Sequence, residues 1–244
     1  MTKALFVLSI LFLTSIPALA QSVDTAWVRR YNGPGDSIDC AYAIAVDGSG
    51  NVYVTGQSCG SGTYPDYGTI KYYPNGDTAW VRRYNGPRFY YDESAIGVDG
   101  SGNVYVTGTS TRSERYSDYA TIKYYANGDT AWVRRYGGPG NLYDWAYAIA
   151  VDGSGNVYVT GESVGSGTGF DYATIKYIQF LRGDCNRDGI ISLSDVRLLA
   201  NYILKGGSAL GPLQSGDVNC DGKYNLVDVI LLARYVLLGE PFPC

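Results

Sequence analysis

The stretch "DYGTIKYYPNGDTAWVRRY" (residues 66–84) decides the fold of most of this chain. Two runs rich in Tyr, Thr, Ile, Val and Trp flank a Pro-Asn-Gly turn at 74–76. Asn-Gly is the strongest short signal for a β-hairpin, because both residues tolerate positive φ. The flanking residue types favour strands, since they pack well on a pleated surface. The stretch therefore predicts two antiparallel strands, at 67–73 and 77–84.

The second half of this hairpin is one of three copies. "DTAWVRRY" begins at Asp24, Asp77 and Asp129, so the repeat spacing is 53 and then 52 residues. Each copy also contains "DGSGNVYVTG", whose Gly-Ser-Gly turn in the first copy separates predicted strands at 41–47 and 51–58. Four antiparallel strands in one repeat are typical of a β-propeller blade.

The copies of "DGSGNVYVTG" and "DYATIKYYANGDTAWVRRY" resemble the SBBP family of bacterial β-propeller repeats. This resemblance implies a mainly β fold with three four-stranded antiparallel blades and implies no single activity. We predict the repeats at 24–76, 77–128 and 129–180, which together fill residues 24–180.

Polar residues that occur once in every copy have a structural explanation. A catalyst is needed at one place, whereas a residue required in each copy belongs to the hydrogen bonding of the blade itself. The residues concerned are Arg29, Arg82 and Arg134, Lys71, Lys123 and Lys176, and Asp66, Asp118 and Asp171. Asp47, Ser49 and Asn51 in the "DGSGN" turn could be weak calcium ligands, but a tight Gly-rich hairpin explains them without an ion.

The phase of the repeat predicts how the blades close. The chain opens on a predicted fourth strand, Asp24–Tyr31, and its third copy stops after the third strand, near Phe180. Three blades fall below the usual four to eight, because each would have to fill a third of a turn. We therefore expect a homodimer that completes a six-bladed ring, in which each Asp24–Tyr31 completes the last blade of the other chain. An open stack, or a fragment of a longer propeller, is the alternative.

A second motif follows the repeats. "GDCNRDGIISLSDV" (183–196) and "GDVNCDGKYNLVDV" (216–229) place oxygen-bearing side chains at alternate positions around a glycine. Hard Ca²⁺ requires six to eight oxygen ligands, and such loops supply them. We predict two calcium ions. The first would be held by Asp184, Asn186, Asp188, the carbonyl of Ile190, Ser192 and Asp195. The second would be held by Asp217, Asn219, Asp221, the carbonyl of Lys223, Asn225 and Asp228.

Each loop leads into one predicted helix, at 193–205 and at 226–238, with apolar residues three and four positions apart. This duplicated loop-helix unit, over 183–244, resembles a type I dockerin. The resemblance implies a cohesin partner and association with polysaccharide-degrading assemblies. The Ser-Thr pair that is frequent in such dockerins is absent from both loops. The implied partner-binding residues are Leu193, Ser194, Leu226 and Val227.

The five cysteines predict two disulfides. Cys40 and Cys59 lie almost symmetrically about the first Gly-Ser-Gly turn, which predicts a bond across the first hairpin. Antiparallel dockerin helices would return the C-terminus to the first loop. That arrangement predicts Cys185–Cys244 and leaves Cys220 unpaired.

The remaining features restrict location and chemistry. Residues 1–20 have the lysine, apolar run and Ala-Leu-Ala end of a signal peptide, which predicts a secreted or cell-surface protein without a membrane span. A net charge of −4 disfavours nucleic acid as a partner. The chain contains no histidine, which excludes Ser-His-Asp relays and His-ligated zinc.

These features favour an exported, non-catalytic binding or structural protein that calcium and a cohesin anchor to an assembly. Two alternatives remain: a small glycoside hydrolase, or a lectin whose tyrosines stack on glycans. The acids specific to one repeat, from which a hydrolase would draw its carboxylates, are Asp92, Glu93, Glu114 and Glu162.

Overall fold

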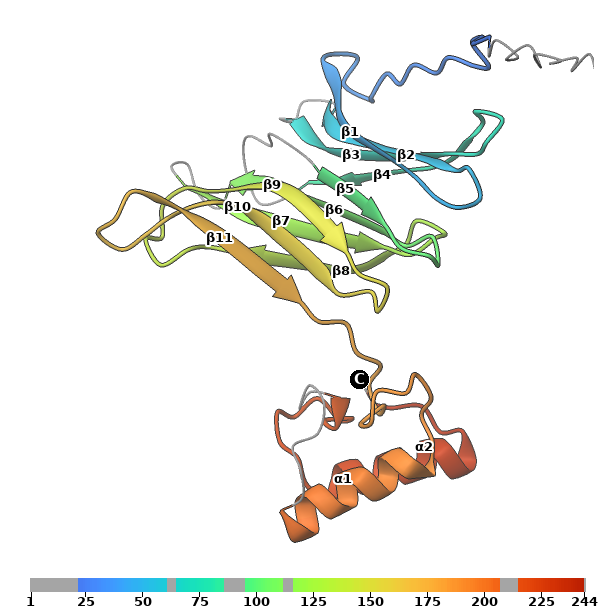
Figure 1. Cartoon of the computed structure of the whole chain (residues 1–244), viewed down its shortest axis with the longest axis vertical. Coiled ribbons are helices and arrows are strands. Elements are labelled where there is room, and N and C mark those ends of the chain that lie inside the picture. Colours follow the sequence, from blue (N-terminus) through green and yellow to red (C-terminus); the bar gives the residue numbers. More distant parts are fainter. Residues whose placement is uncertain (1–21, 61–64, 86–94, 112–115, 207–214, 244) are drawn as a thin grey trace, which may run out of the picture.

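The structure is a computed structural model that describes residues 22–60, 65–85, 95–111, 116–206 and 215–243. Three antiparallel sheets are followed by two helices, and Figure 1 shows the sheets side by side with the helices joined to the third sheet by an extended segment. The predicted signal peptide lies outside the described residues, as do Asp92, Glu93, Glu114 and Cys244. Within the described ranges, no helix has the length and apolar character needed to cross a membrane.

The strands of each sheet follow one another in chain order, and the third sheet has one strand fewer than the others. The first sheet contains β1 (Asp39–Val46), β2 (Val52–Cys59), β3 (Pro65–Tyr72) and β4 (Thr78–Tyr84). The second contains β5 (Ala95–Val98), β6 (Val104–Thr111), β7 (Ser117–Tyr124) and β8 (Thr130–Tyr136). The third contains β9 (Asp144–Val151), β10 (Val157–Val164) and β11 (Phe170–Tyr177).

Turn chemistry explains where the strands end. Gly76 and Gly128 in the Asn-Gly turns have φ of 85° and 90°, a conformation that costs glycine little. In the β1–β2 turn the Asp47 carboxylate accepts hydrogen bonds from the N–H groups of Ser49 and Asn51 and from the Tyr53 hydroxyl. This network engages both carboxylate oxygens of Asp47 in the turn itself.

The apolar core lies between neighbouring sheets. Tyr53 and Tyr67 of the first sheet pack against Val104, Val106 and Ile122 of the second, and all five side chains are buried. The second and third sheets meet in the same way, through Tyr105 and Tyr119 on one side and Val157 and Val159 on the other. Each sheet therefore covers the next, as blades of a propeller do.

The predicted strand Asp24–Tyr31 is wrong for the single chain, because these residues form no strand. A strand requires a neighbour to which its backbone can hydrogen-bond, and the first sheet already has four strands. The segment instead lies against the first sheet. The Trp27 ring is 6.0 Å from that of Tyr72, and Arg29 Nε donates to the Gly76 carbonyl at 2.7 Å.

The predicted Cys40–Cys59 disulfide is also wrong, since both cysteines are free. The register of β1 shifts between Ala41 and Ala43, so that Cys40 lies opposite Gln57, two residues from Cys59. The shift brings the Cys40 carbonyl against the partner strand, where a Cβ on Gly56 would lie 1.9 Å from it. Only glycine leaves room for that approach.

The two helices form where the sequence predicts them, at α1 (Leu193–Lys205) and α2 (Leu226–Leu238). Each ends at a glycine with positive φ, Gly206 and Gly239. Between the helices lies a small core of four buried residues, Cys185, Leu199, Val218 and Leu232.

The predicted Cys185–Cys244 disulfide is wrong, because Cys185 is free and Cys220 is disulfide-bonded. Cys185 belongs to the core between the helices, and burial raises the pKa of its thiol to about 12. The C-terminal segment does return toward the first loop, since Phe242 packs near Gly183 and stacks on Tyr235.

Candidate calcium loops and partner-binding helices

The two loops adopt the same backbone conformation at their sharpest turns. The fourth loop positions, Arg187 and Cys220, have φ of 65° and 60°, although neither is glycine. The sixth positions, Gly189 and Gly222, have φ of 83° and 76°. Two segments with different side chains thus fold alike, which indicates that the shared Asp, Asn and Gly positions determine the turn.

The first aspartate of each loop is held by backbone donors. Asp184 accepts from the N–H groups of Asp188 at 3.2 Å and Gly189 at 3.0 Å. Asp217 accepts in the same way from the N–H groups of the fifth and sixth positions of its own loop, at the same distances. Both carboxylates are buried. In each loop, these bonds draw the backbone around the carboxylate of the first aspartate.

The last aspartate of each loop joins the loop to its helix. Asp195 is fully buried and accepts from the N–H groups of Cys185 at 2.8 Å and Ser192 at 2.9 Å, completing a capping box on α1. Asp228 is likewise buried and accepts from Val218 and Asn225, completing the box on α2. The helix start and the loop therefore share one carboxylate.

The intermediate positions are more open. Asp188 and Asp221 are exposed and accept from the N–H groups of Ile190 and Lys223, while Asn186 and Asn219 donate to these two aspartates. Ser192 Oγ and Asn225 Oδ1 cap the helices. In the described part of the chain, no three His, Cys, Asp or Glu side chains form a metal-binding group. The donor set nevertheless fits calcium in its chemistry, because all the side-chain ligands would be oxygens.

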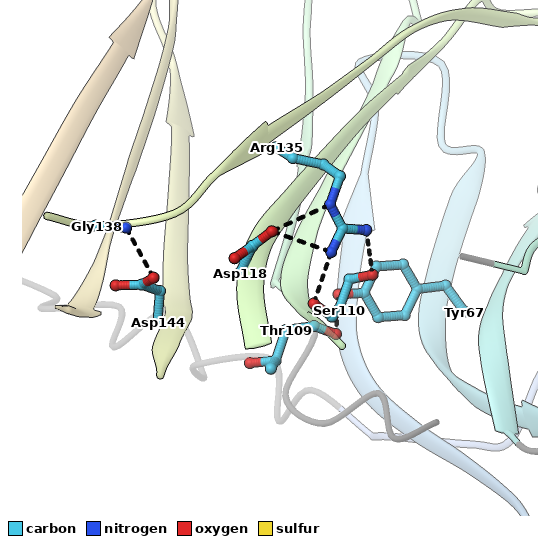
Figure 2. Close-up of polar contacts among 7 residues, drawn as sticks. All are labelled: Tyr67, Thr109, Ser110, Asp118, Arg135, Gly138 and Asp144. Atoms are coloured by element: carbon cyan, nitrogen blue, oxygen red, sulfur yellow. Dashed lines mark hydrogen bonds and ion pairs between the residues drawn. The ribbon is translucent and has the colours of Figure 1, made fainter. Parts of the chain in front are cut away.

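In the first two blades, residues common to every copy are bound within the fold, as predicted. Figure 2 shows Arg135 donating to Asp118 Oδ2 at 3.3 Å and to Ser110 Oγ at 2.7 Å. Lys71 lies over the Tyr53 ring, 5.2 Å from its centroid. Of the acids specific to one repeat, only Glu162 lies in the described residues, where its carboxylate accepts from the Tyr147 hydroxyl at 3.4 Å. These contacts support the blade.

Comparison with known proteins supports the division of the chain into β-sheet repeats and a C-terminal pair of loop-helix units. The family model described as "Dockerin type I domain" matches residues 182–237, and that described as "Beta-propeller repeat" matches 26–62, 79–112 and 131–167. The chain carries three β-propeller repeats and a type I dockerin. A dockerin indicates calcium binding and a cohesin partner.

Other comparisons add little. No curated protein matches this chain. Among solved structures, a fucose lectin from Kordia zhangzhouensis in complex with methyl-fucoside is similar at 12% identity and a TM-score of 0.37, covering 57% of this chain and 97% of that chain. A likeness at this TM-score supports no conclusion about the ligand.

Three of the four predicted partner-binding residues of the dockerin face solvent. Leu193, Leu226 and Val227 are exposed. Ser194 is half-buried, and its Oγ bonds to Ser192 Oγ and accepts from the Asn186 side chain. The structure therefore separates Ser194, which supports the first loop, from the other three.

The helix surfaces differ more than the sequence motif suggested. On α2, Ile230, Leu237 and Leu238 are also exposed. Their counterparts 33 residues earlier on α1 are Arg197, Leu204 and Lys205, so only one of those three is apolar. Applying the 33-residue offset to the helices, as well as to the loops, would have revealed this asymmetry. The dockerin has one face that is mainly apolar and one that is mixed.

Proposed function

We propose that the protein is an exported, non-catalytic binding or structural protein. Its dockerin binds two calcium ions and anchors the repeats to a cohesin-bearing partner, in an assembly that degrades polysaccharide. The observation that carries the proposal is the duplicated loop, folded alike in both copies and joined to its helix through Asp195 and Asp228.

The proposed ions have equivalent sites. Both loops bury their first and last aspartates and turn at a glycine with positive φ. In each loop, the carboxylates and amide oxygens would coordinate the ion, and Ile190 or Lys223 would contribute a backbone carbonyl. Calcium supplies positive charge that offsets three aspartates in each loop. Because Asp195 and Asp228 also cap the helices, ion binding would stabilise loop and helix together.

Calcium titration calorimetry on the mature chain tests the number of ions. The expected stoichiometry is two for the unmodified chain and one for Asp195→Ala or Asp228→Ala. Asp24→Asn is the matched control, because Asp24 is exposed and far from the loops in sequence, and it should retain two sites. A stoichiometry of one for the unmodified chain would contradict the proposal of two ions.

We assign the cohesin-binding surface mainly to α2. Leu226, Val227, Ile230 and Leu237 are exposed on it, and exposed apolar side chains gathered on one helix are typical of a protein interface. On α1, the exposed Arg197 and the internally bonded Ser194 replace two of these residues. The apolar face therefore gives α2 the larger area to desolvate on binding.

Binding to an immobilised type I cohesin tests this assignment. Val227→Asp with Ile230→Asp should weaken binding by more than about tenfold, because charges would be buried against the partner. The matched pair on α1 is Ser194→Asp with Arg197→Asp, for which a smaller loss is expected. EGTA should abolish binding in every case. Equal losses for the two pairs would contradict the preference for α2, and unchanged binding in EGTA would contradict calcium-dependent anchoring.

The non-catalytic part of the proposal is tested with a panel of mixed polysaccharides. We expect no release of reducing sugar by the mature chain in the presence of calcium. Hydrolysis that persists in a repeat fragment without the dockerin would overturn this part. A glycan array on the same sample separates a lectin from a purely structural role, since only a lectin would bind defined sugars.

A further inference from the structure

The third sheet ends in an open edge. Among the described residues, β11 pairs with β10 on one side only, whereas its counterparts β3 and β7 each have strands on both sides. Tyr172 on β11 is 94% exposed, while the equivalent Tyr67 and Tyr119 are almost fully buried. An unpaired strand edge is a template for another strand.

The third sheet also contains a buried polar atom that lacks the partner which its equivalents have in the first and second sheets. In the first sheet, Arg83 on β4 donates to Ser58 Oγ at 2.6 Å and to Asp66 Oδ2 at 2.8 Å. Arg135 on β8 makes the equivalent contacts in the second sheet, with Ser110 and Asp118 (Figure 2).

In the third sheet, the equivalent residues are Ser163 and Asp171. Ser163 is buried, and its Oγ has no hydrogen-bond partner among the described residues. Asp171 is exposed and accepts only from the side chain of Thr168 among the hydrogen bonds of the described residues. An unsatisfied buried hydroxyl costs free energy. The third sheet is therefore prepared for an arginine from a fourth strand that it lacks.

That arginine is present at the start of the chain. "DTAWVRRY" at residues 24–31 places Arg30 at the position of Arg83 and Arg135, and Arg30 is exposed. The segment already packs on the first sheet as a preceding fourth strand would. Trp27 lies 6.0 Å from Tyr72, as Trp80 does from Tyr124.

Hydrogen bonds confirm this equivalence. Arg29 Nε donates to the Gly76 carbonyl at 2.7 Å, and Arg82 Nε donates to the Gly128 carbonyl at the same distance. The segment thus lies where the fourth strand of a preceding sheet belongs, and the described residues provide no first three strands beside it.

A groove shows where those three strands would pack. It has a volume of about 500 Å³ and lies between the segment and the outer face of the first sheet. Its apolar lining includes Ile44, Val52, Val54, Ile70 and Tyr72. The equivalent residues of the second sheet are Ile96, Val104, Val106, Ile122 and Tyr124, all part of the core that Tyr53 and Tyr67 fill.

The residues that would fill the groove are known from the repeat. The third-sheet counterparts of Tyr53 and Tyr67 are Tyr158 and Tyr172. Since Tyr172 is exposed and the lining residue Ile44 is 67% exposed, both halves of this contact face solvent in the single chain. The equivalent residues of the first and second sheets already pack against each other.

We propose that two copies of this chain join head to tail at both ends and close a ring of six blades. Residues Asp24–Tyr31 of each copy form the fourth strand beside β11 of the other, with Arg30 donating to Ser163 and Asp171. Tyr158 and Tyr172 enter the groove beside Ile44. A second copy is the occupant because every contact proposed repeats one that the chain makes between its own sheets, and two equal junctions give closed two-fold symmetry.

Light scattering at increasing concentration tests the ring. The expected mass of the mature chain with calcium is twice that of one chain. Arg30→Glu should raise the dissociation constant at least about tenfold, because it places a carboxylate against Asp171. Arg197→Glu on the dockerin makes the same charge change away from the junction and should leave the mass unchanged. A single-chain mass at high concentration would overturn the proposal.

Disulfide trapping tests which chain supplies the strand. In the first sheet Ile70 lies opposite Val81, so Ile175 should lie opposite Val28 in the completed sheet. With Cys40 and Cys59 replaced by serine, Val28→Cys combined with Ile175→Cys should give covalently linked dimers on oxidation. The Ile175→Cys variant alone is the control and should give none. A disulfide within one chain would overturn the second copy as occupant, and a ladder of longer products would overturn the closed ring.

Discussion

The middle sheet and the dockerin are stabilised in different ways. Every residue of β7 is buried, because the first and third sheets cover both its faces. Each dockerin helix buries only two residues, of which one is an aspartate, Asp195 or Asp228. The repeats depend on apolar contact between neighbouring sheets, and the dockerin depends on polar atoms that hold its loops. Perturbations should therefore separate the two parts.

Removal of calcium should have the largest effect and should act on the dockerin alone. Without the ions, three aspartates in each loop would repel one another, and a core of four buried residues is too small to compensate. EGTA should abolish the helical circular dichroism signal of the mature chain while the β signal remains. A spectrum and melting temperature unchanged by EGTA would show that the loops fold without metal.

A cavity in the inter-sheet core should destabilise the repeats and leave the dockerin unaffected. Ile122→Ala removes a fully buried side chain from β7 and should destabilise the repeats by about 2–5 kcal/mol. Val23→Ala is the control, since that side chain is 97% exposed. Thermal melts followed by the β circular dichroism signal measure the stability of both variants. If Ile122→Ala lowered calcium affinity as well, the two parts would not be independent.

Steric crowding at the register shift of β1 should destabilise the fold less than a cavity in the inter-sheet core. Gly56→Ala places a methyl group against the Cys40 carbonyl and should destabilise the first sheet by about 1–3 kcal/mol. Gly48→Ala is the matched control, because its Cβ would meet no atom within 4 Å. Equal melting temperatures for the two variants would show that β1 can shift its register at little cost.

Loss of the Asp47 charge in acid should produce the smallest and most gradual change, measured in the repeats. Burial tends to raise the pKa of Asp47, but hydrogen bonds from Asn51, Tyr53 and Ser49 outweigh it and lower the pKa to about 2. A lowered pKa in the folded state stabilises it above about pH 4, and this contribution is lost as the pH falls toward 2. Asp47→Asn should flatten the pH dependence of unfolding over that range. The same slope in the variant would rule out this carboxylate as its cause.

Local signals predicted the elements of the fold well. The Asn75-Gly76 turn fixes β3 and β4 because hairpin geometry depends on a few adjacent residues. The two loop motifs predicted both helices to the residue, since Asp195 and Asp228 serve loop and helix cap at once.

Predictions that depended on register or on a neighbour failed. The cysteine pairing assumed a regular ladder, and the shift between Ala41 and Ala43 moves Cys40 away from Cys59. Gly56 and Gly161, where a Cβ would approach a carbonyl to 1.9 Å in both copies, were the available signal for that shift. The segment Asp24–Tyr31 has the composition of a strand, but strand formation requires a partner that the described residues do not place beside it.

The missing fourth strand of the third sheet also has a consequence for the gene. Because the segment Asp24–Tyr31 and the open edge of β11 lie at complementary phases of the repeat, gain or loss of a whole unit would leave this match unchanged. Recombination between the near-identical copies would therefore produce arrays of different length with the same matching ends. Two chains of two or of four units would still form rings of four or eight blades, the limits of the usual range.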